Sequence, residues 1–564
     1  MTSMTGGAAV VESLKAQNVD HVFGLIGSAG MEIFDALYDS DAIRFIGVRD
    51  ERTGVHMADG YARASGQAGV FLAGQNGPGA TNLVTGLGQA YAAFSPVVAL
   101  AGSLSSAHIY RDAFQEVDQQ ALFKPITKKT LTLTHTNRIP EMMREAFRTA
   151  LSPRRGPVLL NLPRDLLAET ADFAEGFDNK GRSFTGGFTG DIEQIGNAAK
   201  LLMNAAQPLI LVGGGVKNTR CHAVVERLAE RLNVPIVMSP GHGDAIPAGH
   251  SLYAGQVGPR GNSVASDLMK RADVILALGT RIGFNTTFYT YDNLNKDAAI
   301  IQVDEDPGAI GRFFPVEIGI MGSAANVASE LEKLLAHHKP ELSVNAWTDA
   351  FKQARSDFIS ERKKSSSEAT TPIKPAFLFN VMREIMPEDA MYTMDAGTLC
   401  LQATDALNYG MTPSLFTPLD FGLVGFSYAC GLGIKLACPE RPVISLMGDG
   451  GFGMTTSEIG TAVQYGINTV CVVMNNGCWG AEKAYQRDFF GERYIGADVP
   501  NPAYDKLAEL WGAKGYRVEK AEDLAAVLKE AIACGRPAIV DVKMDPNALY
   551  SFRRDSFKHR AAKS

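Results

Sequence analysis

The chain has 564 residues, a net charge of −7 and a calculated pI of about 5.9. Apolar residues make up 46% of it and charged residues 20%, which is the composition of ordinary globular domains. This balance excludes the strongly basic surface of a nucleic-acid-binding protein, and no run of 18 apolar residues offers a membrane-spanning helix. We therefore expect neither nucleic acid nor a membrane among the partners.

The cysteines and the first residues of the chain indicate its compartment. The seven cysteines are scattered without a C-x-x-C pair, which is typical of a reducing environment. The opening sequence MTSMTGGAAVVESLKAQNVD lacks the basic and apolar regions of a secretory signal. Together these features predict a cytoplasmic protein.

The first part of the chain, residues 1–172, alternates helices with short apolar strands. Strands that are apolar throughout, rather than at alternate residues, are typical of a parallel sheet with helices on both faces. The first domain is therefore predicted as an open α/β domain. Its predicted elements are a helix over 6–19 and strands over 21–27, 69–74, 97–102 and 156–163.

Two polar stretches divide the rest of the chain. Residues 171–190 are rich in glycine like a linker, and residues 352–375 are charged and rich in serine and threonine. A middle domain is predicted over 190–340, a third domain over 373–548 and a tail over 549–564. The predicted fold class is thus α/β, with three consecutive open parallel-sheet domains. The strands expected in the second and third domains are 208–215, 234–239, 272–279, 298–304, 390–397, 442–450, 468–476 and 536–544.

A glycine run in the middle domain has two interpretations. The segment LVGGGV, residues 211–216, follows a predicted strand and suggests either a dinucleotide site or a tight turn. It lacks the G-x-G-x-x-G spacing of a dinucleotide fingerprint, which favours the turn.

Polar side chains follow two predicted strands of the third domain. Asp449 stands in the turn GDGGFG after the strand VISLM, and Asn475 and Asn476 follow the strand TVCVVM. Ligands of open parallel sheets bind beyond the carboxyl ends of the strands, where glycine lets backbone amides approach a phosphate. A carboxylate beside a phosphate requires a divalent cation between them, and Mg²⁺ prefers oxygen ligands of these kinds. The simpler alternative is that both segments are only turns.

Taken together, the two motifs resemble the signature of the thiamine diphosphate (ThDP) enzymes, GDG followed about two dozen residues later by NN. In this chain it reads GDGGFGMTTSEIGTAVQYGINTVCVVMNN, residues 448–476. The resemblance implies that Asp449, Asn476 and the backbone carbonyl of Cys478 hold Mg²⁺. A zinc-binding or nucleophilic Cys478 is the alternative, but no Cys or His stands within five residues of it.

The same resemblance assigns the third domain as the diphosphate-binding domain and the second as the middle domain of the family. The segments MDAGTL, FGLVGFSY and GDGGFG match the places where the family holds the cofactor. The cofactor-binding residues implied there are Gly397, Thr398, Gly422, Val424, Gly450 and Gly451.

The first domain resembles the pyrimidine-binding domain of these enzymes. The segment RFIGVRDERTGVHMADGYARASG, residues 44–66, matches a strand, the catalytic glutamate and a helix carrying A-[DE]-G-Y-A-R. The match assigns the glutamate to Glu51, which hydrogen-bonds the aminopyrimidine in the family. Asp50 is the competing residue, and a solvated surface charge is the alternative reading of Glu51. Gly79, in GQNGPGATN, is implied near the cofactor.

The family resemblance also concerns assembly. In these enzymes the glutamate reaches the cofactor from a neighbouring subunit. The resemblance therefore implies a homodimer at minimum, and a homotetramer is expected.

Four segments indicate the reaction. They are GLIGSAGMEIFDAL (24–37), AFQEVDQQALF (113–123), WGAEK (479–483) and the tail SFRRDSFKHR (551–560). They resemble the sulfoacetaldehyde acetyltransferase family, which converts sulfoacetaldehyde and phosphate to acetyl phosphate and sulfite. The residues implied at the substrate are Ser28, Gln115, Glu482, Arg553 and Arg554.

Both substrates of that reaction are small anions. Arg553 and Arg554 offer forked guanidinium groups for tetrahedral oxyanions, although a solvated basic tail is the alternative. An acetolactate synthase-like carboligase or decarboxylase acting on a 2-keto acid is the alternative function. Val424 stands where acetolactate synthases carry a methionine, which disfavours it.

Overall fold

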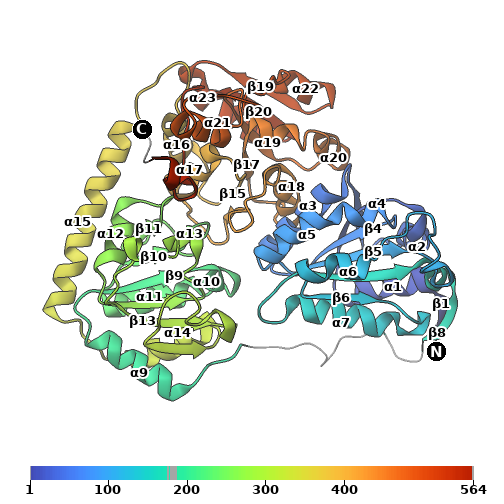
Figure 1. Ribbon diagram of the computed structural model, residues 1–564, viewed down its shortest axis with the longest axis horizontal. Helices are drawn as coiled ribbons and strands as arrows, with labels where there is room; N and C mark the ends of the chain where they lie inside the picture. The colour runs from blue at the N-terminus through green and yellow to red at the C-terminus, as the bar shows by residue number, and fades with distance from the viewer. Residues whose placement is uncertain (1, 174–176, 178–186, 562–564) are drawn as a thin grey trace.

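The computed structural model describes residues 2–173, 177 and 187–561 of the chain. Three α/β domains follow one another, and Figure 1 shows them in blue, green and orange. Each domain is built around a six-stranded sheet of parallel strands. The fold class predicted from the sequence, three consecutive open parallel-sheet α/β domains, is confirmed.

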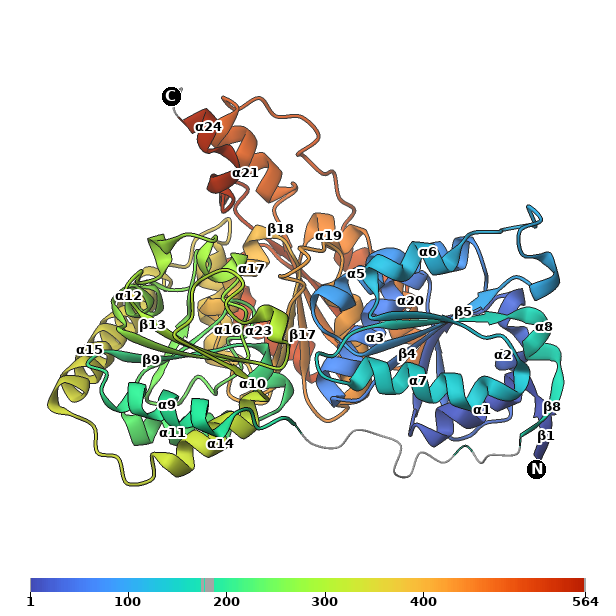
Figure 2. The same cartoon turned by 60° about the horizontal axis from the view of Figure 1, so that its bottom comes forward.

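The sheet of the first domain has the strand order β3-β2-β4-β5-β7-β6. Helices α1 (Gly6–Ala16) and α7 (Ile139–Leu151) cover one face, as Figure 2 shows, while α3 (Glu51–Ser65) and α5 (Leu83–Ala92) pack on the other. The strands are β2 (His21–Leu25), β3 (Arg44–Gly47), β4 (Gly69–Ala73), β5 (Val97–Ser103), β6 (Lys129–Thr132) and β7 (Val158–Pro163).

A small second sheet closes the first domain. Strand β1 (Thr2–Thr5) pairs antiparallel with β8 (Thr170–Phe173), which joins the two ends of the domain. The sequence pattern did not predict this pair, because both strands are short and largely exposed. The predicted linker over 171–190 falls largely on residues outside the described part of the chain.

The middle domain has the strand order β11-β10-β9-β12-β13-β14. At the glycine run, helix α10 (Gly214–Asn218) begins. A Cβ atom on Gly215 would lie 2.6 Å from the Cα of Gly279, so glycine is needed for the close packing of α10 against the turn after β12. The strands are β9 (Pro208–Val212), β10 (Ile236–Met238), β11 (Tyr253–Gln256), β12 (Val274–Leu278), β13 (Ala299–Asp304) and β14 (Ile318–Met321).

A long helix joins the middle and third domains. Helix α15 (Leu342–Ser365) extends over the first part of the polar break at 352–375, where the sequence pattern did not predict a helix. Its buried residues, among them Trp347 and Phe351, all fall in its first half. The second half carries good helix formers but no apolar stripe, and amphipathic periodicity therefore missed it.

The third domain has the strand order β16-β15-β17-β18-β20-β19. Its strands are β15 (Met391–Met394), β16 (Leu415–Phe416), β17 (Val443–Gly448), β18 (Val470–Asn475), β19 (Lys514–Val518) and β20 (Ala538–Lys543). The helices used below are α17 (Thr398–Ala406), α18 (Ser427–Ala437), α19 (Asp449–Gly453), α20 (Glu458–Tyr465) and α21 (Gly480–Phe489).

Helices α3 and α18 form the contact between the first and third domains, side by side in Figure 1. A Cβ atom on Gly60 would lie 2.2 Å from the carbonyl oxygen of Cys430, and one on Gly433 would lie 1.9 Å from that of Met57. Glycine at both positions lets the two backbones touch, which explains the glycine of the A-D-G-Y motif. Within the described ranges, no helix combines the length and apolar character needed to cross a membrane.

Candidate active site

Three neighbouring strand ends of the third domain carry the predicted cofactor residues. Strands β15, β17 and β18 are adjacent and parallel, so their carboxyl ends lie at one edge of the sheet. Helix α17 begins at Thr398 after β15, helix α19 begins at Asp449 after β17, and Asn476 follows β18 directly. The structure therefore brings Thr398, Asp449 and Asn476 to the edge where parallel sheets bind ligands.

Oxygen atoms converge between the second and third of these ends. The side-chain amide of Asn476 directs its oxygen at two acceptors, 3.1 Å from Asp449 Oδ1 and 3.2 Å from the backbone oxygen of Cys478. Without a cation, this amide would turn over to donate its N–H groups to both. Neighbouring oxygens on a Mg²⁺ ion with bonds near 2.1 Å lie about 3.0 Å apart. The three predicted ligands therefore fit a hard divalent cation.

The two adjacent asparagines have different tasks. Asn475 turns into the core, where its Nδ2 donates to Asp541 Oδ1 at 2.8 Å. Asn476 alone faces the strand ends. Because side chains of successive strand residues point to opposite faces, a pair of asparagines delivers only one of them to this site.

Asp449 is held by residues that sequence reasoning missed. It is 1% exposed, and its Oδ2 accepts a hydrogen bond from Asn501 Nδ2 at 2.6 Å. The hydroxyl of Tyr504 lies 2.9 Å from the Asp449 carbonyl oxygen. Burial raises the pKa of Asp449, and the bond from Asn501 opposes that shift. Asn501 and Tyr504 lie in an irregular segment and a short helix, without a motif to mark them.

Cys478 contributes its backbone, not its thiol. Burial raises the pKa of this thiol to about 11, so it carries no thiolate at neutral pH. Among the described residues, no group of three or more His, Cys, Asp or Glu side chains is placed to hold a metal. The zinc and nucleophile alternatives for Cys478 therefore have no structural support.

The predicted diphosphate residues lie around this cluster. Gly397 precedes α17, and a Cβ atom on Gly480 would lie 3.6 Å from Thr398 Oγ1 and 3.4 Å from Asn476 Nδ2. The amino ends of α17 and α21 thus face each other beside Asn476. Backbone N–H groups at such ends are free to bind an anion.

The two glycines after Asp449 are required by close packing. A Cβ atom on Gly450 would lie 2.7 Å from the Trp479 ring, and one on Gly451 would lie 2.2 Å from Asp395 Oδ2. Any side chain at either position would push α19 away from the strand ends.

Asp395 organises the loop that carries Gly422 and Val424. Its carboxylate accepts hydrogen bonds from the backbone N–H groups of Gly425, Phe426 and Ser427, at 2.9, 2.8 and 3.3 Å. Burial raises its pKa to about 6, and these bonds oppose the shift. The signal for Asp395 was present in the sequence, since it follows a buried strand as Asp449 does.

The loop itself bends at two glycines. Gly422 and Gly425 have φ values of +74° and +84°, a region that favours glycine. Val424 approaches the cluster, because its Cγ1 lies 3.2 Å from the Cβ position of Gly451. The loop therefore reaches the edge of the sheet where Asp449 stands.

In the first domain, the neighbouring carboxylates Glu51 and Asp50 have different roles. Asp50 caps helix α3, because its side chain accepts from the N–H of Arg52 at 2.8 Å. Glu51 is 6% exposed and its Oε2 accepts from Asn82 Nδ2 at 3.0 Å, so it is not a solvated surface charge. A Cβ atom on Gly79 would lie 3.3 Å from Glu51 Oε1, a tight contact that favours glycine beside the carboxylate.

Gln75 joins the other two predicted residues of the first domain. Its Oε1 accepts from the N–H of Ser28 at 2.9 Å and from the Ser28 hydroxyl at 3.0 Å, while its Nε2 donates to Gln115 Oε1. Its Cβ also lies 3.1 Å from the Cβ position of Gly79. Ser28, Gly79 and Gln115 thus lie in one cluster with Glu51, around a glutamine that the sequence analysis did not single out.

The two clusters remain separate within the described part of one chain. No hydrogen bond or ion pair joins the Glu51 cluster to the Asp449 cluster there. The domains do touch nearby, since Arg52 Nη2 donates to the Met454 carbonyl at 3.1 Å and Thr53 Oγ1 donates to Glu458 at 2.5 Å. Glu51 itself faces its own domain.

The tail folds back over the third domain. The ring of Phe557 stacks on that of Phe489 in α21, with centroids 5.2 Å apart. The Arg553 guanidinium binds Asp555 and Ser556 of the tail, at 3.2 and 2.8 Å, and is therefore not free of partners. The side chain of Arg554 lies outside the described part of the structure, and Glu482 is exposed in the first turn of α21.

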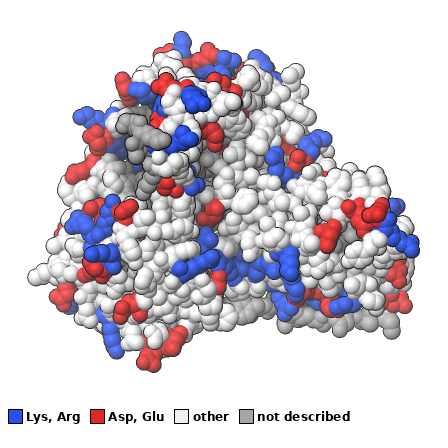
Figure 3. Space-filling view, in the orientation of Figure 1, with Lys and Arg blue, Asp and Glu red and all other residues white. Residues whose placement is uncertain are grey.

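A cavity of about 1,020 Å³ opens between the domains. Lys and Arg side chains gather where the middle and first domains meet, as Figure 3 shows. The cations that line the cavity are Arg63, Arg154, Arg155, Lys217, Arg260, Arg281 and Arg553.

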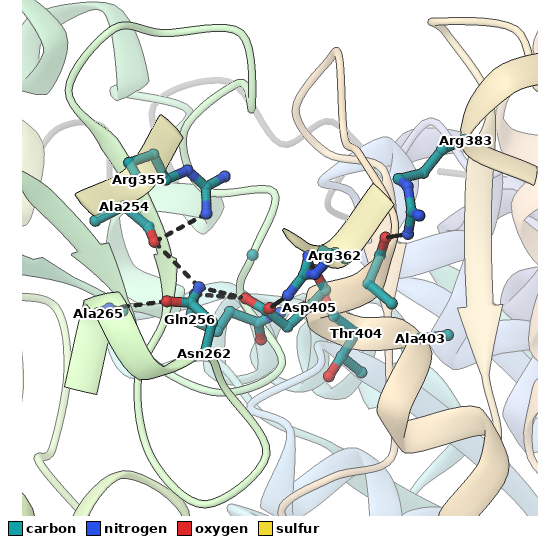
Figure 4. Close-up of polar contacts among 12 residues, drawn as sticks. Ala254, Gln256, Asn262, Ala265, Arg355, Arg362, Arg383, Ala403, Thr404 and Asp405 are labelled. Carbon is teal, nitrogen blue, oxygen red and sulfur yellow. Dashed lines mark hydrogen bonds and ion pairs between the residues drawn. The ribbon is translucent and has the colours of Figure 1, made fainter. Parts of the chain in front are cut away.

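The far end of α17 is fixed to the middle domain (Figure 4). Asp405 Oδ1 accepts from Asn262 Nδ2 at 2.9 Å and from the N–H of Gln256 at 3.0 Å, and its other oxygen binds Arg362 of α15. The helix that begins at Thr398 is thus held in place by two other segments of the chain.

Three protein-family models match the chain in series. Residues 4–122 match the thiamine pyrophosphate enzyme N-terminal TPP binding domain, residues 195–331 the central domain, and residues 395–542 the C-terminal TPP binding domain. Thiamine pyrophosphate is another name for ThDP. Each match falls within one of the three α/β domains, although the first ends before β6 and β7 and the third begins just after β15.

Curated relatives match over nearly the whole chain. A sulfoacetaldehyde acetyltransferase of Castellaniella defragrans is 34% identical over 98% of this chain and 95% of its own length. A second, of Alcaligenes xylosoxydans xylosoxydans, is also 34% identical, with the same coverage. The acetolactate synthase isozyme 3 large subunit of Escherichia coli is 33% identical, over 97% of this chain and 96% of its own.

Proposed function

Because the chain belongs to the thiamine pyrophosphate enzyme family, we propose that it converts sulfoacetaldehyde and phosphate to acetyl phosphate and sulfite. The observation that carries the proposal is the 34% identity to two sulfoacetaldehyde acetyltransferases over 98% of the chain. The cluster of Ser28, Gln75 and Gln115 supports it, because these polar, uncharged side chains, which bond one another in the structure, are of the kinds that can donate to a small anion.

The second candidate is an acetolactate synthase-like reaction on a 2-keto acid. The 33% identity to the Escherichia coli acetolactate synthase large subunit favours it. Val424, at the position where acetolactate synthases carry methionine, argues against it.

The proposed cofactors are ThDP and Mg²⁺. Asp449, Asn476 and the Cys478 carbonyl would hold the cation, and the amino ends of α17 and α21 would hold the diphosphate. When bound, ThDP would supply the nucleophilic carbon that this carbonyl chemistry requires.

The chain's own residues supply proton control and orientation. Glu51 presents a buried carboxylate for a hydrogen bond to the aminopyrimidine, and Asn82 fixes its direction. In the proposed reaction the C–S bond breaks and sulfite leaves. The former aldehyde carbon is oxidised to the acyl level while the methylene carbon is reduced to methyl. Phosphate forms the new C–O bond, so no external oxidant is needed.

A shared active site is part of the proposal. The separation of the Glu51 and Asp449 clusters in one chain supports a homodimer in which each cofactor lies between two subunits. We expect the enzyme to form a homodimer at minimum and a homotetramer in solution.

Complementation tests this arrangement. Glu51→Gln and Asp449→Ala, each of which should have low activity alone, are co-expressed with different tags and purified through both. Mixed dimers with shared sites contain one site without either substitution and should recover about a quarter to a half of the activity. Mixed dimers without activity would refute site sharing.

The function is tested with two substrates side by side. The purified protein, supplied with ThDP and Mg²⁺, is given sulfoacetaldehyde with or without phosphate, and sulfite and acetyl phosphate are measured. Pyruvate is assayed separately for acetolactate and carbon dioxide. Phosphate-dependent, stoichiometric release of both products supports the proposal, whereas turnover of pyruvate alone favours the second candidate.

A further inference from the structure

A second cavity of about 190 Å³ lies against helix α17, beside the predicted diphosphate site. Thr398 and Gln402 line it from α17, Arg260 from the middle domain, and Tyr550 and Phe552 from the tail. Segments from two domains and the tail thus meet at one small space next to Thr398.

Two arginines line this cavity, and Arg260 is the one to which no carboxylate binds in the described part of the chain. Its guanidinium covers the Phe552 ring, 4.1 Å from the centroid, and Nη1 donates to Asn285 Oδ1 at 3.3 Å. No Asp or Glu forms an ion pair with it among the described residues. Burial, assisted by the neighbouring Arg553, lowers its pKa to about 10, so it stays charged at neutral pH.

The other charges in the cavity wall are already paired. Arg362 and Asp405 bind each other, and Asp405 also accepts bonds from Asn262 and Gln256 (Figure 4). Arg553, a neighbouring charge outside this wall, is occupied by Asp555. Arg260 is half-buried, and none of its nitrogens is among the described buried polar atoms that lack a partner. Its remaining N–H groups are therefore open to the cavity or to solvent, where an anion can accept hydrogen bonds from them.

We propose that Arg260 is the main cation of an oxyanion subsite in the cavity beside Thr398, which takes a tetrahedral phosphate or sulfonate group. The subsite deepens the proposed function, because both substrates of that reaction carry such a group. The proposal also changes the role of the tail, because Arg553 was expected to bind the substrate anion directly. Arg553 holds the tail through Asp555 and adds positive potential, while Phe552 orients the Arg260 plane.

Direct binding tests the subsite without turnover. Protein loaded with ThDP and Mg²⁺, in a Tris chloride buffer free of phosphate and sulfonate, is titrated calorimetrically with inorganic phosphate and, separately, with ethanesulfonate. Arg260→Gln should weaken binding of at least one anion by about 10- to 100-fold, and Arg260→Lys should weaken it less because the charge remains. Arg227→Gln, on the exposed surface of the middle domain, is the matched control and should change neither affinity.

The two titrations identify the source of the oxyanion. Loss of phosphate binding alone assigns the subsite to the acceptor, and loss of ethanesulfonate binding alone assigns it to the sulfonate of the donor. Unchanged binding of both anions in Arg260→Gln overturns the subsite. A role limited to holding the tail predicts that outcome, together with a lower thermal midpoint.

Kinetics separate this inference from the proposed function. If acetyl phosphate forms and Arg260→Gln raises the KM of one anionic substrate about 10-fold or more at similar ThDP affinity, both stand. If it forms with unchanged KM values, the function stands and the subsite fails. If none forms but anion binding depends on Arg260, the subsite stands and the function fails.

Discussion

The carboxyl edges of the first and third sheets present opposite electrostatic situations. In the first domain, the Glu51 carboxylate is buried and receives a hydrogen bond from Asn82. In the third domain, the Asn476 amide oxygen faces the Asp449 carboxylate and the Cys478 carbonyl, 3.1 and 3.2 Å away. Glu51 therefore has a donor beside it. At the other edge Asn501 donates to one oxygen of Asp449, while the second oxygen, the Cys478 carbonyl and the Asn476 amide oxygen come together as acceptors.

This difference indicates that the third-domain edge depends on a bound cation for its geometry, whereas the first-domain edge does not. Glu51 is oriented before any cofactor arrives, because its partner is part of the same domain. The Asp449 cluster is stable only if a cation lies among its oxygens or if the amide of Asn476 turns over. Mg²⁺ should therefore organise the third domain and leave the first nearly unchanged.

The largest expected effect comes from substituting Glu51, at the edge of the first sheet that is ordered without a ligand. Glu51→Gln should lower turnover by about 10²–10⁴-fold, because the amide is a poor replacement for a proton-transfer group. ThDP affinity, measured by calorimetry, should stay within severalfold, since Glu51 does not touch the diphosphate site. Turnover near that of the unsubstituted protein would remove Glu51 from its proposed role.

The next largest effect is expected at the edge of the third sheet, when one of its oxygen ligands is removed. Asp449→Ala or Asn476→Ala should weaken Mg²⁺ retention by about 10- to 150-fold, because each removes a ligand from a small ion that demands fixed geometry. Equilibrium dialysis of Mg²⁺ and calorimetry of ThDP measure this loss. Equal metal affinity in the variants and the unsubstituted protein would contradict the oxygen cluster as the binding site.

Asn475 provides a matched neighbour for Asn476. Asn475→Ala should reduce the free energy of unfolding by about 1–3 kcal/mol, because Asp541 loses a buried donor. Its effect on Mg²⁺ affinity should be smaller than that of Asn476→Ala. Urea unfolding followed by the fluorescence of the three tryptophans, Trp347, Trp479 and Trp511, gives the stability change. A reversed order of the two metal affinities would exchange the roles of the asparagines.

The smallest effect concerns pH and the loop anchored by Asp395. Its pKa of about 6 in the folded protein exceeds the usual value of 3.8, so the folded state holds more protons between these values. Stability should therefore fall as pH rises from about 4 to about 6, by at most about 1.4 kcal/mol per pH unit.

Asp395→Asn isolates this contribution, because an amide does not titrate. As pH rises from about 4 to about 6, the urea midpoint of the unsubstituted protein should fall relative to that of Asp395→Asn. A difference that stays constant from pH 4 to 7 would mean that Asp395 has an ordinary pKa.

The sequence predicted the inner four strands of every sheet, and the pattern missed most of the edges. Strands such as β5 and β18 are buried on both faces and read as continuous apolar runs. The edge strands β6 and β19 are partly exposed, and their sequences KTLT and KGYRV carry no such signal. Only the edge strand ahead of Glu51 was expected, through the family resemblance. A strand at an edge is specified by its single neighbour rather than by its own burial.

For the site, the sequence by itself determined which polar residues and glycines stand directly after the buried strands. The glycines, Asp449 and Asn476 follow buried strands in fixed order, so their meeting at one sheet edge follows from parallel topology. Only the tertiary structure decided that Asn501 steadies Asp449 and that Arg260 and Phe552 share a cavity. Arg260 and Phe552 come from different parts of the chain, and no local pattern marks either one. Domain packing alone brings such residues together, because side-chain interactions between distant segments depend on how the finished sheets and helices dock.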